Sequence, residues 1–259
     1  HIDVAEKLKK FEEESGKDVF VIPGNHDYGV DCATNLDDFV RIYADFGFDK
    51  AIETFEDTAS YTADLGDKYR LIALDSCDPT VSTADGMSLK EIMWVCDQAD
   101  KAYEDGRYPI LMMHHNLLDH LPMQRIVSKN FIVRFHYTTA TLFADHGIKV
   151  VFSGHEHCND TTSYTTPSGN TIYDFATTSL SMYPIQYTVM QLTDDKIAYN
   201  AKTITSIDTD ALSSTVKGYT DEQIALMNED FNAYAKGFLK AGVRYRLELS
   251  LSMEKMGIA

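Results

Sequence analysis

Residues 18–27 have the sequence DVFVIPGNHD, in which an apolar run leads into three polar side chains. The run 18–23 predicts a buried strand, and Gly24 then allows the chain to turn sharply. Asn25, His26 and Asp27 follow, and each carries a side chain that can bind a metal or move a proton. Such a tetrad is weak support for a site by itself, so its meaning depends on the rest of the chain.

Two later stretches repeat this arrangement. The sequence MHHN at 113–116 follows an apolar run at 109–113, and GHEH at 154–157 follows another at 148–152. In open α/β sheets, sites form where loops leave the carboxyl ends of the strands. If these strands are neighbours in one sheet, the three polar clusters converge on one site.

The residue types in the clusters suit metal chemistry. His155 and His157 offer two imidazoles, which bind Zn, Fe or Mn, and Asn25 offers a neutral carbonyl oxygen. Asp27 can fix the tautomer of His26, and a histidine so oriented can donate a proton to a leaving oxygen. Two metals roughly 3.5–4 Å apart would activate a water and hold a phosphoryl group.

Plainer interpretations stay open for each cluster. Asn25 is also a common turn residue, and His114 and His115 could be one core and one exposed imidazole. A His-x-His pair also occurs in loops by chance. It is the order and repeated position of the three clusters that favours a metal site. His120 and His136 are candidates for contact with a substrate.

The remaining chain predicts α/β layers around two sheets, one mixed and one mainly antiparallel. Helices are expected at 2–14, 36–47, 89–104, 137–146, 221–240 and 243–256. A hairpin is expected at 61–74, with its turn at Gly66-Asp67. Residues 76–87 are expected to form a loop, and 206–219 a linker. The later strands are expected at 162–166, 170–176, 186–193 and 196–204.

Composition limits the function classes. The chain has 259 residues, 44% of them hydrophobic, and a formal net charge of −17. This charge disfavours a nucleic-acid partner, unless a metal reverses its sign locally. No apolar run approaches the roughly 20 residues that span a bilayer. The four cysteines form no Cys-x-x-Cys pair, so we expect free thiols.

The motifs together resemble those of the calcineurin-like metallophosphoesterases. The resemblance rests on GNHD at 24–27, His114 and GHEH at 154–157, which look like the last three of the five motifs of that family. Residues 38–48 and 114–120 further resemble a bacterial branch described as cyclic-nucleotide phosphodiesterase-like.

The resemblance implies a role for each site residue. Asn25, His114 and His155 would bind one metal ion and His157 another, the two ions being Mn, Fe or Zn. His26 would hold phosphate or protonate the leaving group, with Asp27 orienting it. His115 and His120 are the further candidates for substrate binding. The substrate would be a small phosphate ester or cyclic nucleotide, not a nucleic-acid duplex.

The resemblance also implies a domain plan. Residues 1–205 would form a four-layer αββα metallophosphoesterase sandwich lacking its first strands, and residues 206–259 a linker and the start of a helical appendage. The first two family motifs, Asp-x-His and Gly-Asp-x-x-Asp, do not precede Gly24 in this sequence. We therefore expect the chain to be a fragment that binds metal weakly and is nearly inactive. Relatives in this branch favour export or membrane anchoring over a cytoplasmic location.

Other functions stay open at this point. One is a phosphomonoesterase or nucleotidase. Another is a metal-binding module without catalysis. A nuclease is disfavoured by the charge of −17 and the lack of a basic stripe.

Overall fold

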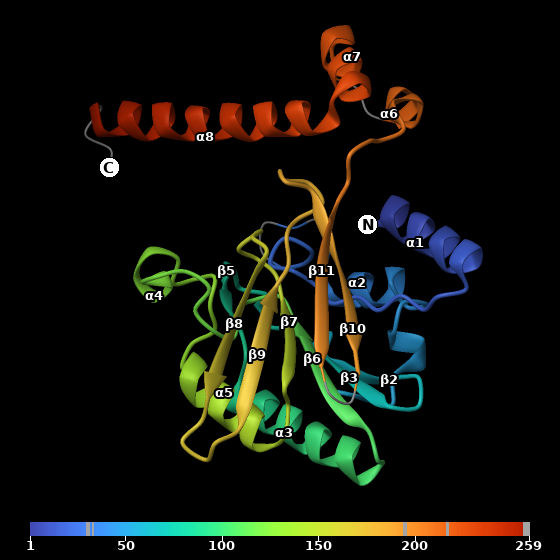
Figure 1. Cartoon of the computed structure of the whole chain (residues 1–259), viewed down its shortest axis with the longest axis vertical. Helices are drawn as coiled ribbons and strands as arrows, with labels where there is room; N and C mark the ends of the chain where they lie inside the picture. The colour runs from blue at the N-terminus through green and yellow to red at the C-terminus, as the bar shows by residue number, and fades with distance from the viewer. Residues whose placement is uncertain (30–31, 33, 194–195, 216–217, 256–259) are drawn as a thin grey trace. The chain divides into compact units, whose positions relative to one another are not determined.

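The computed structural model describes residues 1–29, 32, 34–193, 196–215 and 218–255. These form two compact units, His1–Ala176 and Thr177–Ala259 (Figure 1). Each unit is described separately below. The boundary between family domain and appendage at 205/206 stays a prediction, because compactness alone does not delimit a family domain.

A seven-stranded sheet organises the first unit. In spatial order it comprises β1 (Glu53–Thr54), β2 (Tyr61–Leu65), β3 (Tyr69–Leu74), β6 (Tyr108–Met113), β7 (Val150–Ser153), β9 (Thr171–Ala176) and β8 (Asp160–Thr165). The strands β3, β6, β7 and β9 are parallel to one another, and the outer pairings are antiparallel. The carboxyl ends of the four parallel strands therefore lie at one edge of the sheet.

Two helices cover one face of this sheet. Helix α3 (Leu89–Glu104) lies against β3 and β6, α5 (His136–Asp145) lies against β9, and the two helices contact each other. Helix α3 begins where the Ser88 side chain accepts a hydrogen bond from the Glu91 amide, as its capping spacing predicts. The core between the layers contains Leu111, Phe143 and Val151, all fully buried.

The N-terminal segment folds differently from its prediction. Helix α1 (Ile2–Ser15) confirms the expected helix, while α2 (Leu36–Ile42) is shorter than expected and is followed by a 3₁₀ turn at Phe48–Lys50. Residues 18–23 do not form the predicted strand. This segment makes single hydrogen bonds to separate parts of the chain. Val21 N donates to Phe46 O at 3.1 Å, and the Tyr61 hydroxyl donates to Val21 O at 2.9 Å. A strand needs a continuous ladder with a neighbour, and these single bonds do not provide one.

Two loops contain elements that the sequence did not predict. The expected loop 76–87 includes a small antiparallel pair, β4 (Cys77–Asp78) and β5 (Val81–Asp85). The loop after His114 contains the short helix α4 (Gln124–Val127). All four cysteines are free, as expected.

In the described part of the second unit, the elements are one hairpin and three helices. The predicted strands are confirmed as β10 (Gln186–Leu192) and β11 (Ile197–Thr203). The expected linker contains α6 (Thr209–Thr215), and the last two predicted helices divide instead at Asp230, into α7 (Asp221–Glu229) and α8 (Phe231–Lys255). A small core joins these parts and includes Ile185, Met227 and Phe231.

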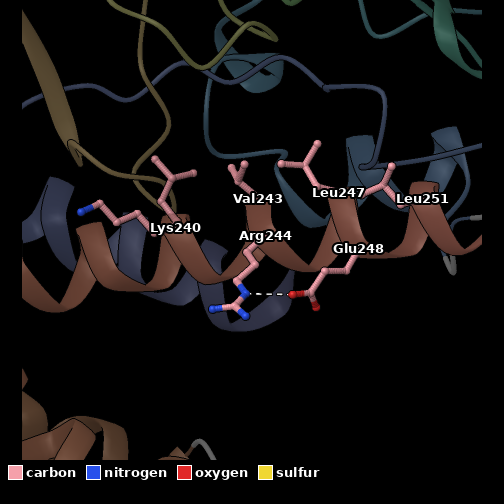
Figure 2. Close-up of a pocket in the computed structure, with 7 residues that line it drawn as sticks. Lys240, Val243, Arg244, Leu247, Glu248 and Leu251 are labelled. Carbon is pink, nitrogen blue, oxygen red and sulfur yellow. Dashed lines mark hydrogen bonds and ion pairs between the residues drawn. The ribbon is translucent and has the colours of Figure 1, made fainter.

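Beyond its first turns, α8 leaves apolar side chains exposed. Val243, Leu247 and Leu251 share one side of the helix, beside an ion pair between Arg244 and Glu248 at 2.8 Å (Figure 2). Among the described residues, none of the helices has the length and apolar character that crossing a bilayer requires.

The packing beneath β6 predicts a specific loss of stability. Leu111→Ala should lower the free energy of unfolding by about 3 kcal/mol, because it leaves a cavity in the core. Leu89→Ala should change it by less than about 0.5 kcal/mol, because Leu89 is 71% exposed. Urea unfolding followed by the fluorescence of Trp94, the single tryptophan, reports on this unit. Equal losses in the two variants would contradict this account of the core.

Candidate functional site

The carboxyl ends of β6 and β7 bring two of the predicted clusters together. The two strands are parallel neighbours, with Met112 opposite Phe152. His114 directly follows β6, and His155 lies two residues after β7 ends. The Gly154 amide donates a hydrogen bond to the His114 carbonyl at 3.0 Å, so the two loops are joined beside the site.

The third cluster reaches the same place through a tight turn at 24–27. The Asp27 amide donates to the Gly24 carbonyl at 3.0 Å, and the Gly24 amide donates to Asp27 Oδ2 at 2.6 Å. This turn buries the Asn25 side chain and leaves His26 exposed. The convergence expected of the three clusters is therefore present, although residues 18–23 are not a strand.

Three atoms that could bind a metal ion, one from each loop, lie close together around His114. Its Nε2 lies 2.8 Å from Asn25 Oδ1 and 3.0 Å from His155 Nδ1. The three residues are separated by 89 and 41 positions in the sequence, so only the fold brings them together. Phe131 stacks on the His155 ring with centroids 4.0 Å apart and limits its rotation.

Gly24 is packed closely against the His114 ring. A Cβ at position 24 would lie 3.0 Å from both Cε1 and Nδ1 of His114, which is closer than side chains normally approach. At Gly154 the nearest atoms to an added Cβ are at 3.6 and 3.8 Å, an ordinary contact. The ring of His114 is thus held against the backbone of the Gly24 turn.

The imidazoles of the site are kept neutral. Burial, together with the repulsion between protonated rings of His155 and His115, lowers the pKa of His114 to about 2. Burial, and the same kind of repulsion from His115 and His157, lower the pKa of His155 to about 3. A neutral imidazole has a free lone pair, which is the form that binds a metal.

The donor set fits a metal ion. An amide oxygen and two neutral imidazole nitrogens are accepted ligands of Zn, Mn and Fe. Ligands roughly 2.1 Å from an ion, at angles between square and tetrahedral, are roughly 3.0–3.4 Å apart, close to the observed separations. Within the described ranges, no group of three or more His, Cys, Asp or Glu side chains is arranged to hold a metal. The set of potential ligands here combines two histidines with the Asn25 amide oxygen.

His26 and His157 lie at the edge of this cluster. Both are exposed. Partial burial and the charge of His26 lower the pKa of His157, and both residues also lower the pKa of His114. The backbone at His155 and His157 is left-handed, with φ of 64° and 54°. This conformation is unusual for a residue with a side chain and is frequent at functional sites.

The Asp27 carboxylate accepts its hydrogen bond from the backbone of the turn, at the Gly24 amide. Burial raises the pKa of its carboxyl, while the hydrogen bond from the Gly24 amide opposes that effect. Its predicted role in orienting His26 stays a prediction. The role that this geometry supports is closure of the turn that presents Asn25.

His115 and His120 are both enclosed by protein. The His115 ring is fully buried, with Nδ1 2.9 Å from the Ser76 hydroxyl. His120 Nδ1 lies 3.0 Å from Asp160, its Nε2 lies 3.3 Å from Asp174, and the side chain has no exposed surface. A substrate must reach a ring to touch it, so these positions favour structural roles over the predicted substrate contacts.

Some residues that shape the site had no signal in the sequence. Ser76 holds His115, and Asn116 donates from Nδ2 to Ser153 Oγ at 2.8 Å and to Gly154 O at 3.2 Å. Asp174 accepts bonds from the loop after β6 and from Ser153. A polar residue inside a strand pattern does not by itself indicate such a role, and only the contacts show it.

The fold and this site together define an α/β protein with a cluster of potential metal ligands at the edge of a parallel-rich sheet. The chain belongs to the calcineurin-like phosphoesterase family, whose sequence model matches residues 2–159. The mixed α/β fold class predicted from the sequence is confirmed and is consistent with the metallophosphoesterase sandwich. Metal-dependent hydrolysis of phosphate esters is the chemistry of this family.

Solved structures that match include a dimetal phosphatase from Danio rerio. It is 13% identical, with 78% of this chain and 75% of that chain covered and a TM-score of 0.49. No curated protein matches the chain.

The close approach of Gly24 to His114 can be tested by two matched variants. Gly24→Ala should weaken Zn²⁺ or Mn²⁺ binding at least tenfold, because the new methyl displaces the His114 ring. Gly154→Ala should bind within about threefold of the unmodified protein, since its Cβ meets only ordinary contacts. Isothermal titration calorimetry measures both, and equal affinities would refute the role of Gly24.

The enclosed His120 predicts a pH-dependent contribution to stability. Burial lowers its pKa, but Asp174 and Asp160 outweigh that effect and raise it above the ordinary 6.5. The stabilisation is therefore fully present below about pH 6.5 and is lost as pH rises through the raised pKa. His120→Asn should cost about 3 kcal/mol at pH 5.5 and less at pH 9, by thermal unfolding. A difference that does not change with pH would contradict this assignment.

Proposed function

We propose that this protein hydrolyses small phosphodiesters, such as cyclic nucleotides, at a binuclear metal centre. The proposal rests on one observation: His114 Nε2 lies 2.8 Å from Asn25 Oδ1 and 3.0 Å from His155 Nδ1. These three residues come from the three family-like motifs, and their chemistry suits a divalent ion. The proposal refines the general activity that family membership gives.

In the proposed site, Asn25, His114 and His155 hold one metal ion and His157 contributes to holding a second. Bound metal ions supply positive charge for the phosphoryl oxygens and activate the attacking water. The protein itself fixes the ligands: the Gly24 turn places Asn25 and His114 together, and Phe131 holds the ring of His155.

His26 is the proposed proton donor. Its side chain is exposed and follows the buried Asn25 in the sequence. In this role it would contact phosphate and protonate the leaving oxygen. His115 and His120 are left out of the proposed substrate contacts because their rings are enclosed.

Two considerations favour a diester substrate. A phosphodiester carries one negative charge and a monoester close to two, so a chain of net charge −17 repels the monoester more strongly. The resemblance of residues 38–48 and 114–120 to a cyclic-nucleotide phosphodiesterase-like branch agrees with this preference.

The test compares bis-(p-nitrophenyl) phosphate with p-nitrophenyl phosphate in the presence of Mn²⁺ or Zn²⁺. We expect slow turnover with preference for the diester, since within the described ranges no acidic side chain joins the three donors. His114→Ala should reduce kcat/KM at least about 100-fold, because it removes the central ligand.

A surface histidine gives the control. His146 follows the end of α5, and its Nδ1 lies 2.9 Å from Asp100 of α3. His146→Asn should leave turnover unchanged. Chelation should abolish turnover and metal should restore it. A preference for the monoester would support the phosphomonoesterase alternative, and tight metal binding without any turnover would support a non-catalytic metal-binding module.

A further inference from the structure

The carboxylate of Asp174 lies where the loops that carry His114 and His155 come together. Asp174 is in β9, opposite Val151 of β7, and has no exposed surface. A buried carboxylate is costly unless several donors satisfy it. The identity of those donors therefore indicates what the residue does.

Its two oxygens bind two different segments. Oδ2 accepts hydrogen bonds from the amides of Leu117 and Leu118, at 2.8 and 2.9 Å, and lies 3.3 Å from His120 Nε2. Oδ1 accepts from the Ser153 hydroxyl at 2.7 Å. The first two donors belong to the loop that follows His114, and Ser153 is the last residue of β7, two positions before His155.

Ser153 extends this link back toward β6. Its Oγ accepts a hydrogen bond from Asn116 Nδ2 at 2.8 Å, and the same Nδ2 lies 3.2 Å from the Gly154 carbonyl. The chain just after His114 and the chain just before His155 are thus both bonded to the same carboxylate. Hydrogen bonds to a charged acceptor contribute about 1.5–3 kcal/mol each, more than those between neutral groups.

A metal site needs this kind of restraint. Ligands must be held within about 0.5 Å of their productive positions, by groups that are themselves fixed. The loop segments 114–118 and 153–155 continue the paired strands β6 and β7, and the Gly154 amide donates a hydrogen bond to the His114 carbonyl at 3.0 Å. Where the strand pairing ends, the side-chain bonds of Asp174 and Asn116 add restraint to both segments.

We propose that Asp174 is a positioning residue that sets the spacing of His114 and His155, acting through Ser153 and the amides of Leu117 and Leu118. This inference rests on the proposed metal site. It assigns to Asp174 a role in metal affinity that is separate from its contribution to stability.

The experiment compares Zn²⁺ affinity, by isothermal titration calorimetry, with thermal stability in the full chain. Asp174→Ala removes the shared acceptor. Ser153→Ala keeps the bonds to Leu117 and Leu118 but removes the link to β7 and the bond from Asn116, so the second variant serves if the first does not fold. We expect each folded variant to bind Zn²⁺ at least tenfold more weakly than the unmodified protein at a temperature where both are folded.

A second acid controls for a purely structural effect. Asp64 lies 2.6 Å from the buried Arg70, at the end of the β2–β3 hairpin away from the site. Asp64→Asn should lower the thermal midpoint but leave Zn²⁺ affinity within about twofold, because the break is remote from the ligands. If affinity in all three variants simply follows stability, the positioning role of Asp174 is wrong.

A metal-free crystal structure of Ser153→Ala separates this inference from the proposed function. The separation of His114 Nε2 and His155 Nδ1, 3.0 Å here, should increase by more than about 1 Å in the variant. If the unmodified protein binds no metal, the proposed function fails, yet this distance still tests the positioning role. If it binds Zn²⁺ and the variant keeps both affinity and spacing, the positioning role fails and the proposed function stands.

Discussion

Nε2 of His114 has an amide oxygen 2.8 Å away on one side and an imidazole nitrogen 3.0 Å away on the other, and the first unit of the structure is arranged around this contact. Parallel pairing of β6 and β7 sets the positions of His114 and His155. The turn at Gly24 brings in Asn25 and leaves no room for a side chain against the His114 ring. Because each donor comes from a different segment, the site exists only when the sheet is formed.

Burial of these imidazoles disfavours their protonated, charged forms. Removing His114 and His155 from water, close to one another, lowers the pKa of each and makes their protonated forms unfavourable. The left-handed backbone at His155 and His157 adds local strain. A fold selected for stability alone would place apolar side chains here, as it does at Val151 and Leu111. Such costs gathered at one sheet edge are typical of a functional site.

Much of this arrangement could be predicted from the sequence, since short apolar runs that end in polar clusters report strand ends directly. β6 and β7 were predicted with the histidines that follow them, and the convergence of the clusters follows from their parallel pairing. Residues 18–23 have the same apolar pattern but no ladder, because strand formation depends on a neighbour that a local pattern does not report.

The roles of single residues are also hard to predict from the sequence where they depend on long-range contacts. Asp174 stands in an ordinary strand pattern, TIYDFA, and its partners Leu117 and Ser153 are 57 and 21 positions away. Helix α6 was not predicted, because its segment is rich in Ser, Thr and Asp, a composition typical of a linker. In both cases tertiary contacts decide the outcome, and composition does not register them.

The net charge and the neutral site together indicate an order of binding. A chain of charge −17 attracts cations and repels phosphate, and imidazoles with lowered pKa values offer phosphate no positive charge near neutral pH. Only a bound cation can reverse the local sign, because an ion is then the largest charge in the site. In the proposed function, metal binding would therefore precede binding of an anionic ester, and residues that set the spacing of the proposed ligands would affect affinity for both.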